Sequence, residues 1–370
     1  MNLREAAVGR DNNFNLIRMV AATAVLVSHG FALRSGDPST EPLHSLIGMS
    51  LGTIAVDVFF ASSGFLVTAS MLRRGSAVDF ARARILRIYP AAIVACLLTV
   101  SLLGPAVTTL GLREYFASLT TWEYLLKGVT MIGGVSFHLP GVFESNPYPR
   151  AVNGSLWSMP WELRMYALLL VLWIGAGIAG AARMSCFRGG VVSIAVLGVI
   201  LACVHELRPV ANTQGIGLLA MFFVGGACHL LGDRISLPRW GGPLALGVVL
   251  GCGVAGPEAF SLAWIACAPY LILWCAYMPS RTIRVYNRLG DYSYGVYIFA
   301  FPVQQLIMRV NPEIGMISFT LFAFGISVGL AAFSWHLVEK PCLRFVSGST
   351  TGDIARRSAA SRPSLSVEAS

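Results

Sequence analysis

The chain has 370 residues, of which 55% are hydrophobic and only 12% are charged, and its formal net charge is +9. Soluble domains carry charged side chains at about 25% of their positions, so this composition excludes a surface that faces water on all sides. The composition indicates a polytopic membrane protein, so the lipid bilayer is an expected partner. The eight cysteines include no C-x-x-C pair, so neither a disulfide framework nor a metal site is expected.

Ten apolar windows follow one another along the chain, most of them near the length that crosses a bilayer. We expect an all-α membrane bundle of about ten transmembrane helices, in which the first window is a retained helix and not a cleaved signal peptide. The windows are residues 14–33, 46–72, 88–104, 155–178, 190–205, 213–232, 241–255, 259–278, 291–309 and 314–337.

The segments outside these windows are one long connection and two tails. Segment 105–154 contains Trp122 and the proline-rich stretch NPYPR, and we predict a re-entrant or interfacial element there. Residues 1–13 are predicted to be a cytoplasmic tail and residues 14–341 a single transmembrane domain. Residues 342–370 are rich in Ser, Thr and Arg and are predicted to be a disordered cytoplasmic tail.

The basic residues are unevenly distributed between the two sides of this predicted bundle. With ten spans and a cytoplasmic N-terminus, nineteen of the 27 Lys and Arg residues fall on the cytoplasmic side and six on the other. This is the positive-inside pattern of membrane proteins. Both termini are therefore predicted to be cytoplasmic, and the positive charge is read as a topology signal, so no nucleic-acid partner is expected.

The first window carries an arginine and a histidine in the stretch RMVAATAVLVSHG. Arg18 and His29 are eleven residues apart, so they share one helix face about 16 Å apart along the axis. Ionisable side chains within a bilayer are costly and are therefore candidates for function. Taken singly, Arg18 also fits a snorkelling anchor and His29 a hydrogen-bonded core residue. Their common face favours a shared role.

Two carboxylates within the windows are further candidates. Asp57 lies in GTIAVDVFFASSGFL, and Glu162 lies in NGSLWSMPWELRMYALLL. Either could orient the imidazole of His29, although a carboxylate at the start of a helix, as for Glu162, is also favoured by the helix dipole. We keep both residues as catalytic candidates beside His29.

The stretch RRGSAVDFARARILRIYP holds five arginines, with Arg84 and Arg87 three residues apart on a predicted helix. A positive-inside loop that touches anionic lipids explains such a cluster. The alternative is a phosphate clamp, because the guanidinium group presents a fixed fork of donors to phosphate oxygens. A cytoplasmic acyl-coenzyme A (acyl-CoA) would supply those phosphates.

Two stretches near the C-terminal end of the predicted bundle also contain polar residues. GDYSYGVYIFAFPVQQL places a serine, tyrosines and two glutamines in one apolar helix, which polar contacts between helices explain in large part. SWHLVEKP ends the last window, and an ion pair at the membrane edge explains much of it. The absence of G-x-S-x-G, G-x-x-x-x-G-K-[ST] and H-E-x-x-H patterns removes support for a hydrolase, an ATPase or a metalloprotease.

Taken in order, these segments resemble the acyltransferase 3 family of integral-membrane acyltransferases. The matching pieces are Arg18 with His29, VDVFFASSGFL, Arg84 with Arg87 before IYP, SLWSMPWELRMY, YSYGVYIFAFPVQQ and SWHLVEKP. They extend from residue 14 to residue 341. Each piece is short, but six of them in the same order are specific.

The resemblance implies O-acylation of a surface or secreted saccharide by a protein of the bacterial inner membrane. It implies a cytoplasmic acyl-CoA donor, most often acetyl-CoA, and no tightly bound cofactor. It marks His29 as essential to transfer, as a general base or a transient acyl carrier, and Arg18, Arg84 and Arg87 as acyl-donor-binding. The other motif positions are Ser63, Ser155, Trp157, Tyr166, Tyr294, Tyr297, His336 and Glu339.

Two departures from the family pattern limit what the resemblance implies. Many members carry a histidine before FPV, where this chain has Ala300. Many also carry a fused extracytoplasmic SGNH-type domain, whereas here a short polar tail is expected after the last window. The protein is therefore expected to act alone or to pass its acyl group to a separate extracytoplasmic acyltransferase partner.

Two other interpretations remain open from the residues alone. In a transporter or flippase, intramembrane charges line a substrate path, but such proteins are often built from inverted repeats, and none is evident here. In a membrane-bound O-acyltransferase of the unrelated type, the essential histidine would be His138 in segment 105–154, although the residues around it give little support.

Overall fold

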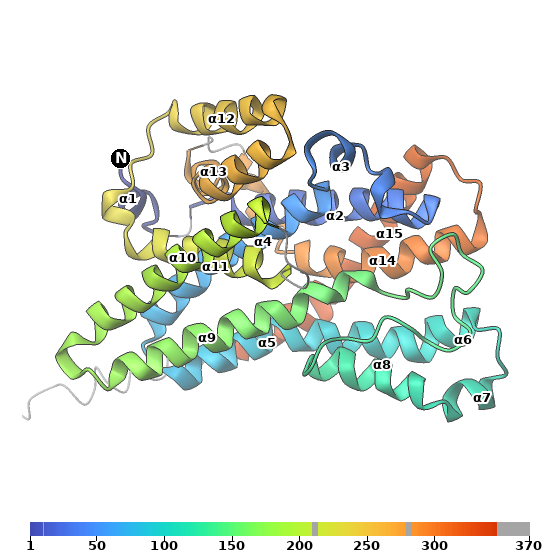
Figure 1. Ribbon diagram of the computed structural model, residues 1–370. Coiled ribbons are helices and arrows are strands. Elements are labelled where there is room, and N and C mark those ends of the chain that lie inside the picture. Colours follow the sequence, from blue (N-terminus) through green and yellow to red (C-terminus); the bar gives the residue numbers. More distant parts are fainter. Residues whose placement is uncertain (10, 209–213, 279–282, 346–370) are drawn as a thin grey trace, which may run out of the picture.

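The computed structural model describes residues 1–9, 11–208, 214–278 and 283–345, and within these ranges the chain is helical without a β-strand (Figure 1). The predicted all-α bundle is confirmed. Each of the ten apolar windows overlaps one long helix. These helices are α2 (Phe14–Ser35), α4 (Leu51–Arg74), α5 (Ala77–Leu98), α9 (Met159–Gly177), α10 (Arg183–Leu207), α11 (Gln214–Leu230), α12 (Gly241–Ala255), α13 (Pro257–Tyr277), α14 (Ser293–Val310) and α15 (Met316–Ser334).

Seven stretches among the described residues are long and apolar enough to cross a membrane, which fits a multi-pass membrane protein. Helices α11 and α12 are apolar but shorter. The number of ten spans and the cytoplasmic position of both termini stay predictions. The seven stretches are Phe14–Ser35, Leu51–Arg74, Ala77–Val107, Gly154–Gly177, Gly180–Leu207, Pro257–Tyr277 and Met316–Phe345.

Segment 105–154 forms short helices and a loop at the end of the bundle opposite to α1 (Leu3–Ala6) (Figure 1). The side chain of Gln305 on α14 donates to the carbonyl oxygens of Tyr148 and Ala151, at 2.9 and 2.7 Å. Asn146 donates back to the Gln305 side chain at 2.6 Å. These bonds hold the loop against the bundle. The short helices are α6 (Gly104–Val107), α7 (Leu112–Ala117) and α8 (Leu119–Thr130).

The two predicted tails are described to different extents. The N-terminal segment packs on the chain after α11, because the Leu3 amide donates to the Ile235 carbonyl at 2.8 Å. Asn2 and Glu5 form a capping box that begins α1. Of the predicted C-terminal tail, residues 346–370 lie outside the described residues.

Helices α2 and α4 run side by side through the centre of the bundle, and their ends follow from their sequences. Ser50 caps the start of α4 by accepting from the Thr53 amide at 3.0 Å. Gly36 ends α2 with φ of 80°, and Gly75 ends α4 with φ of 67°. Glycine suits this left-handed conformation because it has no Cβ. Each helix therefore ends at a glycine that its sequence supplies.

Helices α4 and α11 pack backbone against backbone through glycines. A Cβ at Gly64 would lie 1.8 Å from the Phe222 carbonyl oxygen, and one at Gly225 would lie 2.1 Å from the Ala61 carbonyl oxygen. Small residues allow this close approach, which is how helices in membranes gain van der Waals contact. The contact fixes α11 on the face of α4 away from α2.

Replacing Gly225 with valine should destabilise the protein by about 3 kcal/mol or more, because the clash is with backbone that cannot rotate away. Gly217→Val on the same helix is the matched control, since nothing lies within 4 Å of a Cβ at that position. The measurement is the melting temperature of both purified variants in detergent. Equal melting temperatures would contradict the close α4–α11 packing.

Candidate active site

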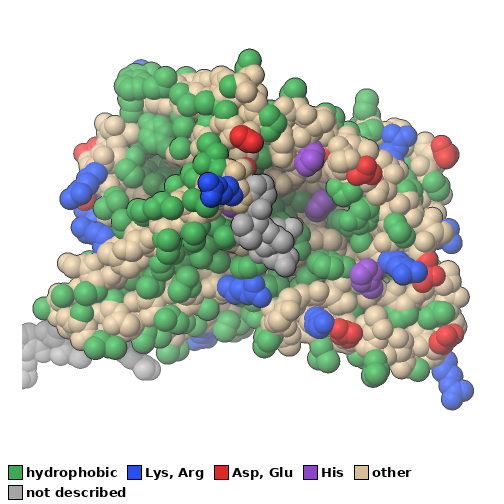
Figure 2. Space-filling view, in the orientation of Figure 1, with side chains coloured by type: hydrophobic (Ala, Val, Ile, Leu, Met, Phe, Trp, Pro, Cys, Tyr) green, Lys and Arg blue, Asp and Glu red, His purple; other side chains and the backbone are tan. Residues whose placement is uncertain are grey.

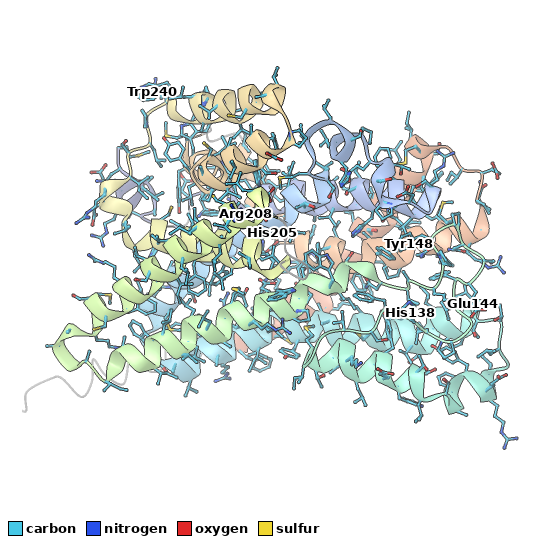
Figure 3. All side chains as sticks on the ribbon, viewed as in Figure 1. His138, Glu144, Tyr148, His205, Arg208 and Trp240 are labelled. Atoms are coloured by element: carbon cyan, nitrogen blue, oxygen red, sulfur yellow. The ribbon has the colours of Figure 1, made fainter. Side chains whose placement is uncertain are left out.

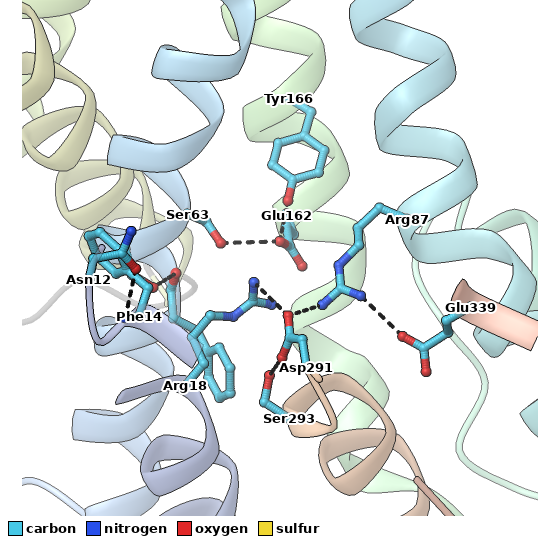
Figure 4. A network of polar contacts seen from close by, with 12 residues as sticks. Asn12, Phe14, Arg18, Ser63, Arg87, Glu162, Tyr166, Asp291, Ser293 and Glu339 are labelled. Carbon is cyan, nitrogen blue, oxygen red and sulfur yellow. Dashed lines mark hydrogen bonds and ion pairs between the residues drawn. The ribbon is translucent and has the colours of Figure 1, made fainter. Parts of the chain in front are cut away.

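Asp291 is the centre of a buried network of charges (Figure 4). Its carboxylate contacts the guanidinium of Arg87 and lies 3.5 Å from the guanidinium of Arg18. The other side of the Arg87 guanidinium contacts Glu339 at 3.1 Å. Ser293 donates its hydroxyl to Asp291 at 2.5 Å. The network joins α2, α5, the start of α14 and the π-helical turn that follows α15.

Local geometry brings the two carboxylates of this network inward. Asp291 follows Gly290, whose φ of 113° turns the chain directly before α14. Glu339 ends a π-helical turn, Trp335–Glu339, and accepts from the Ser334 hydroxyl at 3.1 Å. The ion pair expected for this motif at the membrane edge is thus formed with Arg87 inside the bundle, where the Glu339 side chain is 1% exposed.

Glu162 and Arg84 lie next to this network. Tyr166 donates its hydroxyl to Glu162, and Ser63 donates to the same carboxylate oxygen at 3.4 Å. The Arg84 guanidinium lies over the Tyr166 ring, 5.8 Å from its centroid. Among the described residues Arg84 has no ion-pair partner, and its buried Nε has no hydrogen-bond partner. Its charge is therefore available for a ligand.

A cavity of about 230 Å³, here called the arginine cavity, opens between these side chains. It lies at the end of the bundle where α4 passes into α5. Four arginines reach it, together with the carboxylate of Glu162. The side chains that line it include Arg18, Arg73, Arg84, Arg87, Glu162 and Tyr166.

A second, larger cavity of about 880 Å³ lies at the opposite end of α2 and contains His29, so we call it the histidine cavity. Figure 2 shows histidine side chains around a hollow in the right half of this face. The loop between α8 and α9 contributes His138 and Tyr148, which Figure 3 labels. The buried Nδ1 of His29 has no hydrogen-bond partner in the described part of the chain, and its ring meets Phe301 edge-on at 5.1 Å.

A small space that we call the constriction adjoins the two cavities. Its volume is about 30 Å³, which holds a water molecule or two. It shares Arg18 and Glu162 with the arginine cavity and Val56 with the histidine cavity. Phe59 and Tyr297 also line it, with their rings edge to face at 5.6 Å. The constriction thus adjoins both cavities, and we call this row of three spaces along α2, from Arg18 to His29, the path.

Asp57 and Glu162 lie away from the predicted catalytic histidine. Asp57 accepts from the indole N–H of Trp264 at 2.9 Å, in the contact between α4 and α13, and it lines neither cavity. Glu162 lies at the level of Arg18. Since α2 is continuous, the eleven-residue spacing to His29 amounts to about 16 Å. Neither carboxylate is hydrogen-bonded to His29 in the part of the chain that the structure describes, so no contact supports their role in orienting the imidazole ring.

Other motif residues lie around the same path. The Tyr297 hydroxyl shares a hydrogen bond with Ser158 at 2.7 Å, and Tyr294 donates to the Ile88 carbonyl at 2.8 Å. Trp157 lines the histidine cavity. The hydroxyl of Ser155 is buried and has no hydrogen-bond partner among the residues that the structure describes. His336 bonds to Tyr292 at 3.1 Å and does not line the path.

Two residues of this region were missed by the sequence analysis. Asp291 precedes an apolar helix, and the sequence offered no sign of its role beyond the position of a single acidic residue after a glycine. Glu41 is 3% exposed, although it lies in the short connection after α2. It accepts from the Ser28 hydroxyl and from the Leu51 amide, both at 2.5 Å, and it lines the histidine cavity. Glu41 thereby ties the residue next to His29 to the start of α4.

Comparison with known proteins identifies the family to which this chain belongs. A family model described as an acyltransferase domain matches residues 11–337, so the chain belongs to the acyltransferase 3 family. A Shigella phage Sf6 protein named O-acetyl transferase is 30% identical over 369 residues, which cover 92% of this chain and 98% of the relative. Nodulation protein 10 of Rhizobium leguminosarum bv. viciae is 29% identical over 384 residues, which cover 95% and 98%. No solved structure matches the chain.

The protein is therefore an O-acyltransferase, and the predicted family and enzyme class are confirmed. The family model covers Arg18, His29, Arg84 and Arg87. The roles of these individual residues stay predictions, because the comparisons carry no information on single positions.

Asp291→Asn should destabilise the protein by about 3 kcal/mol near neutral pH, because it leaves the buried charges of Arg18 and Arg87 without their shared partner. Melting temperatures of the variant and of the unmodified protein near neutral pH check this. Asp233→Asn, which breaks the exposed pair with Arg4, is the control and should cost less than about 1 kcal/mol.

Proposed function

We propose that this O-acyltransferase moves an acetyl group from cytoplasmic acetyl-CoA to a saccharide hydroxyl on the other side of the bacterial inner membrane. The observation that carries the proposal is that one helix, α2, brings Arg18 to one cavity and His29 to another. The constriction adjoins both cavities, which supports transfer between them. The name of the phage relative, O-acetyl transferase, supports acetyl as the transferred group.

The arginine cavity suits the donor because several guanidinium groups converge on it. Phosphates are polyanions, and arginine binds them in a fork of two parallel hydrogen bonds. The distribution of basic residues along the chain supports a cytoplasmic position for this end. In this proposal the phosphates stay among the arginines, while the thioester arm points along α2 towards the constriction.

The histidine cavity suits a saccharide acceptor because it combines volume with polar and aromatic side chains. Ligand pockets of several hundred Å³ with a few convergent polar groups are typical of sites for small polar ligands. Sugar hydroxyls would bond to the carboxylates and imidazoles, and the flat faces of the sugar would pack on Trp157 and Tyr148. The polar groups are Asp37, Glu41, His44 and His138.

His29 lines this cavity from α2, the helix that also carries Arg18, and we assign it the role of general base. Its imidazole removes the proton of the acceptor hydroxyl while that oxygen attacks the thioester carbonyl carbon. The carbon–sulfur bond breaks, and the departing thiolate takes up the proton from the imidazolium. The products are the saccharide ester and free CoA. Burial favours the neutral imidazole that this step requires.

The first test is to measure O-acyl groups on surface and secreted glycans by NMR, before and after mild base, in matched strains. Strains with the intact gene should carry esters, whereas strains without the gene or with His29→Ala should lack them, because removal of a general base lowers the rate about 10²–10⁴-fold. His138→Ala, in the same cavity, is the comparison: it removes one sugar contact and should reduce the esters without abolishing them. Membrane levels of each variant are measured in parallel.

Three outcomes contradict the proposal in different ways. Loss of esters in the His138 variant alone would favour the unrelated type of membrane O-acyltransferase. Identical spectra in all strains would remove the saccharide acceptor. Movement of a glycan across vesicles that contain the purified protein and no acyl donor would favour a transporter or flippase.

The constriction provides a second test. Val56→Phe should block the passage where it meets the histidine cavity, and it should reduce acyl transfer by at least about tenfold without changing the affinity for CoA. Val58→Phe adds the same volume on the same helix outside the lining of the constriction and serves as the control. Acyl transfer rates and CoA affinities of the two purified variants check this, with melting temperatures to confirm folding. Unchanged transfer by Val56→Phe would contradict a path through the constriction.

A further inference from the structure

A third cavity lies beside the N-terminal segment, and we call it the N-terminal cavity. Its volume is about 400 Å³, and residues of α1, α4, the first turns of α10 and the end of α11 line it. Phe65 and Leu72 of α4 contribute to this lining, whereas other positions of the same helix line the arginine cavity. Among the described residues the two cavities share no lining side chain. The N-terminal cavity is therefore a space that the proposed acyl transfer does not use.

Basic side chains meet at this cavity with little counter-charge. Arg4 and Arg188 line it, together with His229. Arg4 contacts Asp233 at 2.5 Å, but both side chains of this pair are more than half exposed, so solvent weakens the pairing. No carboxylate lies within 4.0 Å of the Arg188 guanidinium in the parts of the chain that the structure describes. Positive charge is thus left at this cavity for an anion.

The imidazole of His229 adds a hydrogen-bond donor to this basic group. Its ring is partly buried and lies edge-on against Phe65, with the ring centroids 5.0 Å apart. Arg4 is close enough for its charge to act on His229. No described residue forms a hydrogen bond with the His229 ring. Since a neutral imidazole carries one N–H, the ring can donate to a ligand in the cavity.

Most of the remaining lining is apolar. Leu3 and Leu230 are buried, whereas Val8 and Met184 are exposed, at 77% and 42%. The apolar stretch that contains α10 has only 28% of its residues buried within the protein, so most of this helix faces lipid. The cavity therefore suits a ligand that has both an anionic group and an apolar part.

A phospholipid with an anionic headgroup has these two parts. Basic pockets between transmembrane helices on the cytoplasmic side of a membrane bind such headgroups, and the guanidinium fork fits phosphate oxygens. The distribution of basic residues supports a cytoplasmic position for Arg4 and Arg188. The volume of the cavity suits a headgroup and the first methylene groups, so the acyl chains would lie outside it, along α10.

We propose that the N-terminal cavity binds the headgroup of an anionic phospholipid, with its phosphate between Arg4 and Arg188 and a headgroup oxygen accepting from His229. Backbone hydrogen bonds tie the N-terminal segment to the chain after α11, where the Leu3 amide donates to Ile235 and the Leu237 amide donates to Met1. The bound lipid ties the same segment to α10 on the other side of the cavity. It thereby stabilises this end of the bundle.

The test uses the purified full-length protein in nanodiscs of phosphatidylcholine, in which the share of phosphatidylglycerol is raised stepwise. Native mass spectrometry should show one phosphatidylglycerol bound per chain in preference to phosphatidylcholine. The melting temperature should rise with the phosphatidylglycerol share by about 2–4 °C, because a ligand that binds the folded state stabilises it.

Two variants should weaken this binding for different reasons. Arg188→Gln should require about fivefold more phosphatidylglycerol for the same occupancy, since one arginine near an anionic lipid contributes about that factor. Ala7→Trp fills the cavity without a change of charge and should abolish the preference. Arg234→Gln is the matched control, because Arg234 is exposed beside Asp233 and does not line the cavity. Melting temperatures in phosphatidylcholine alone report whether each variant folds.

Three results would overturn the proposal. The first is an unchanged preference for phosphatidylglycerol in either Arg188→Gln or Ala7→Trp. The second is an equal loss in Arg234→Gln, since the lipid would then respond to net charge alone. The third is an equal rise in melting temperature with inorganic phosphate in nanodiscs of phosphatidylcholine, because the cavity would then bind a soluble anion. None of these results depends on acyl transfer, so the proposed function stands or falls separately.

Discussion

The carboxylate of Asp291 between two guanidinium groups is the interaction on which the rest of the site depends. Charges inside a membrane protein must be paired, because their desolvation is costly. One carboxylate satisfies Arg18 from α2 and Arg87 from α5, and Arg87 reaches Glu339 in the π-helical turn that follows α15. Helices distant in sequence are thereby fixed around one point. The same pairing determines which arginines retain free charge.

Helix α2 sets the arrangement of the two cavities around that point. Its first turns hold Arg18 in the network, and its last turns hold His29 beside the loop between α8 and α9. That loop is itself tied to α14 by Gln305. The donor and acceptor sites that we propose are therefore positioned by the same helices, and the spacing between them follows from the helical rise. A change in either end of α2 would alter both.

The sequence predicted the helices well because hydrophobic windows are a local signal, and each window overlaps one helix. The residues of the first helix were likewise found from a local spacing. The sequence did not predict the contacts of the charged network, because Arg87 lies 204 residues from Asp291 and 252 residues from Glu339. Asp57 was placed near His29 by its residue type alone, whereas its partner Trp264 is 207 residues away. Contacts between residues so far apart leave no local pattern in the sequence from which they could be predicted.

The narrowness of the constriction also bears on the energy supply of the cell. A protein with deep cavities at both ends leaves only a thin layer between two aqueous compartments, and the membrane voltage falls across that layer. A proton or cation that crossed it would dissipate about 2.3 kcal/mol for each 100 mV. In the function that we propose, the aromatic pair Phe59 and Tyr297, with the positive charge of Arg18 beside it, would lie in this layer. It would act as an electrical insulator, and the acyl group would cross by a side-chain movement that admits a neutral chain and excludes ions.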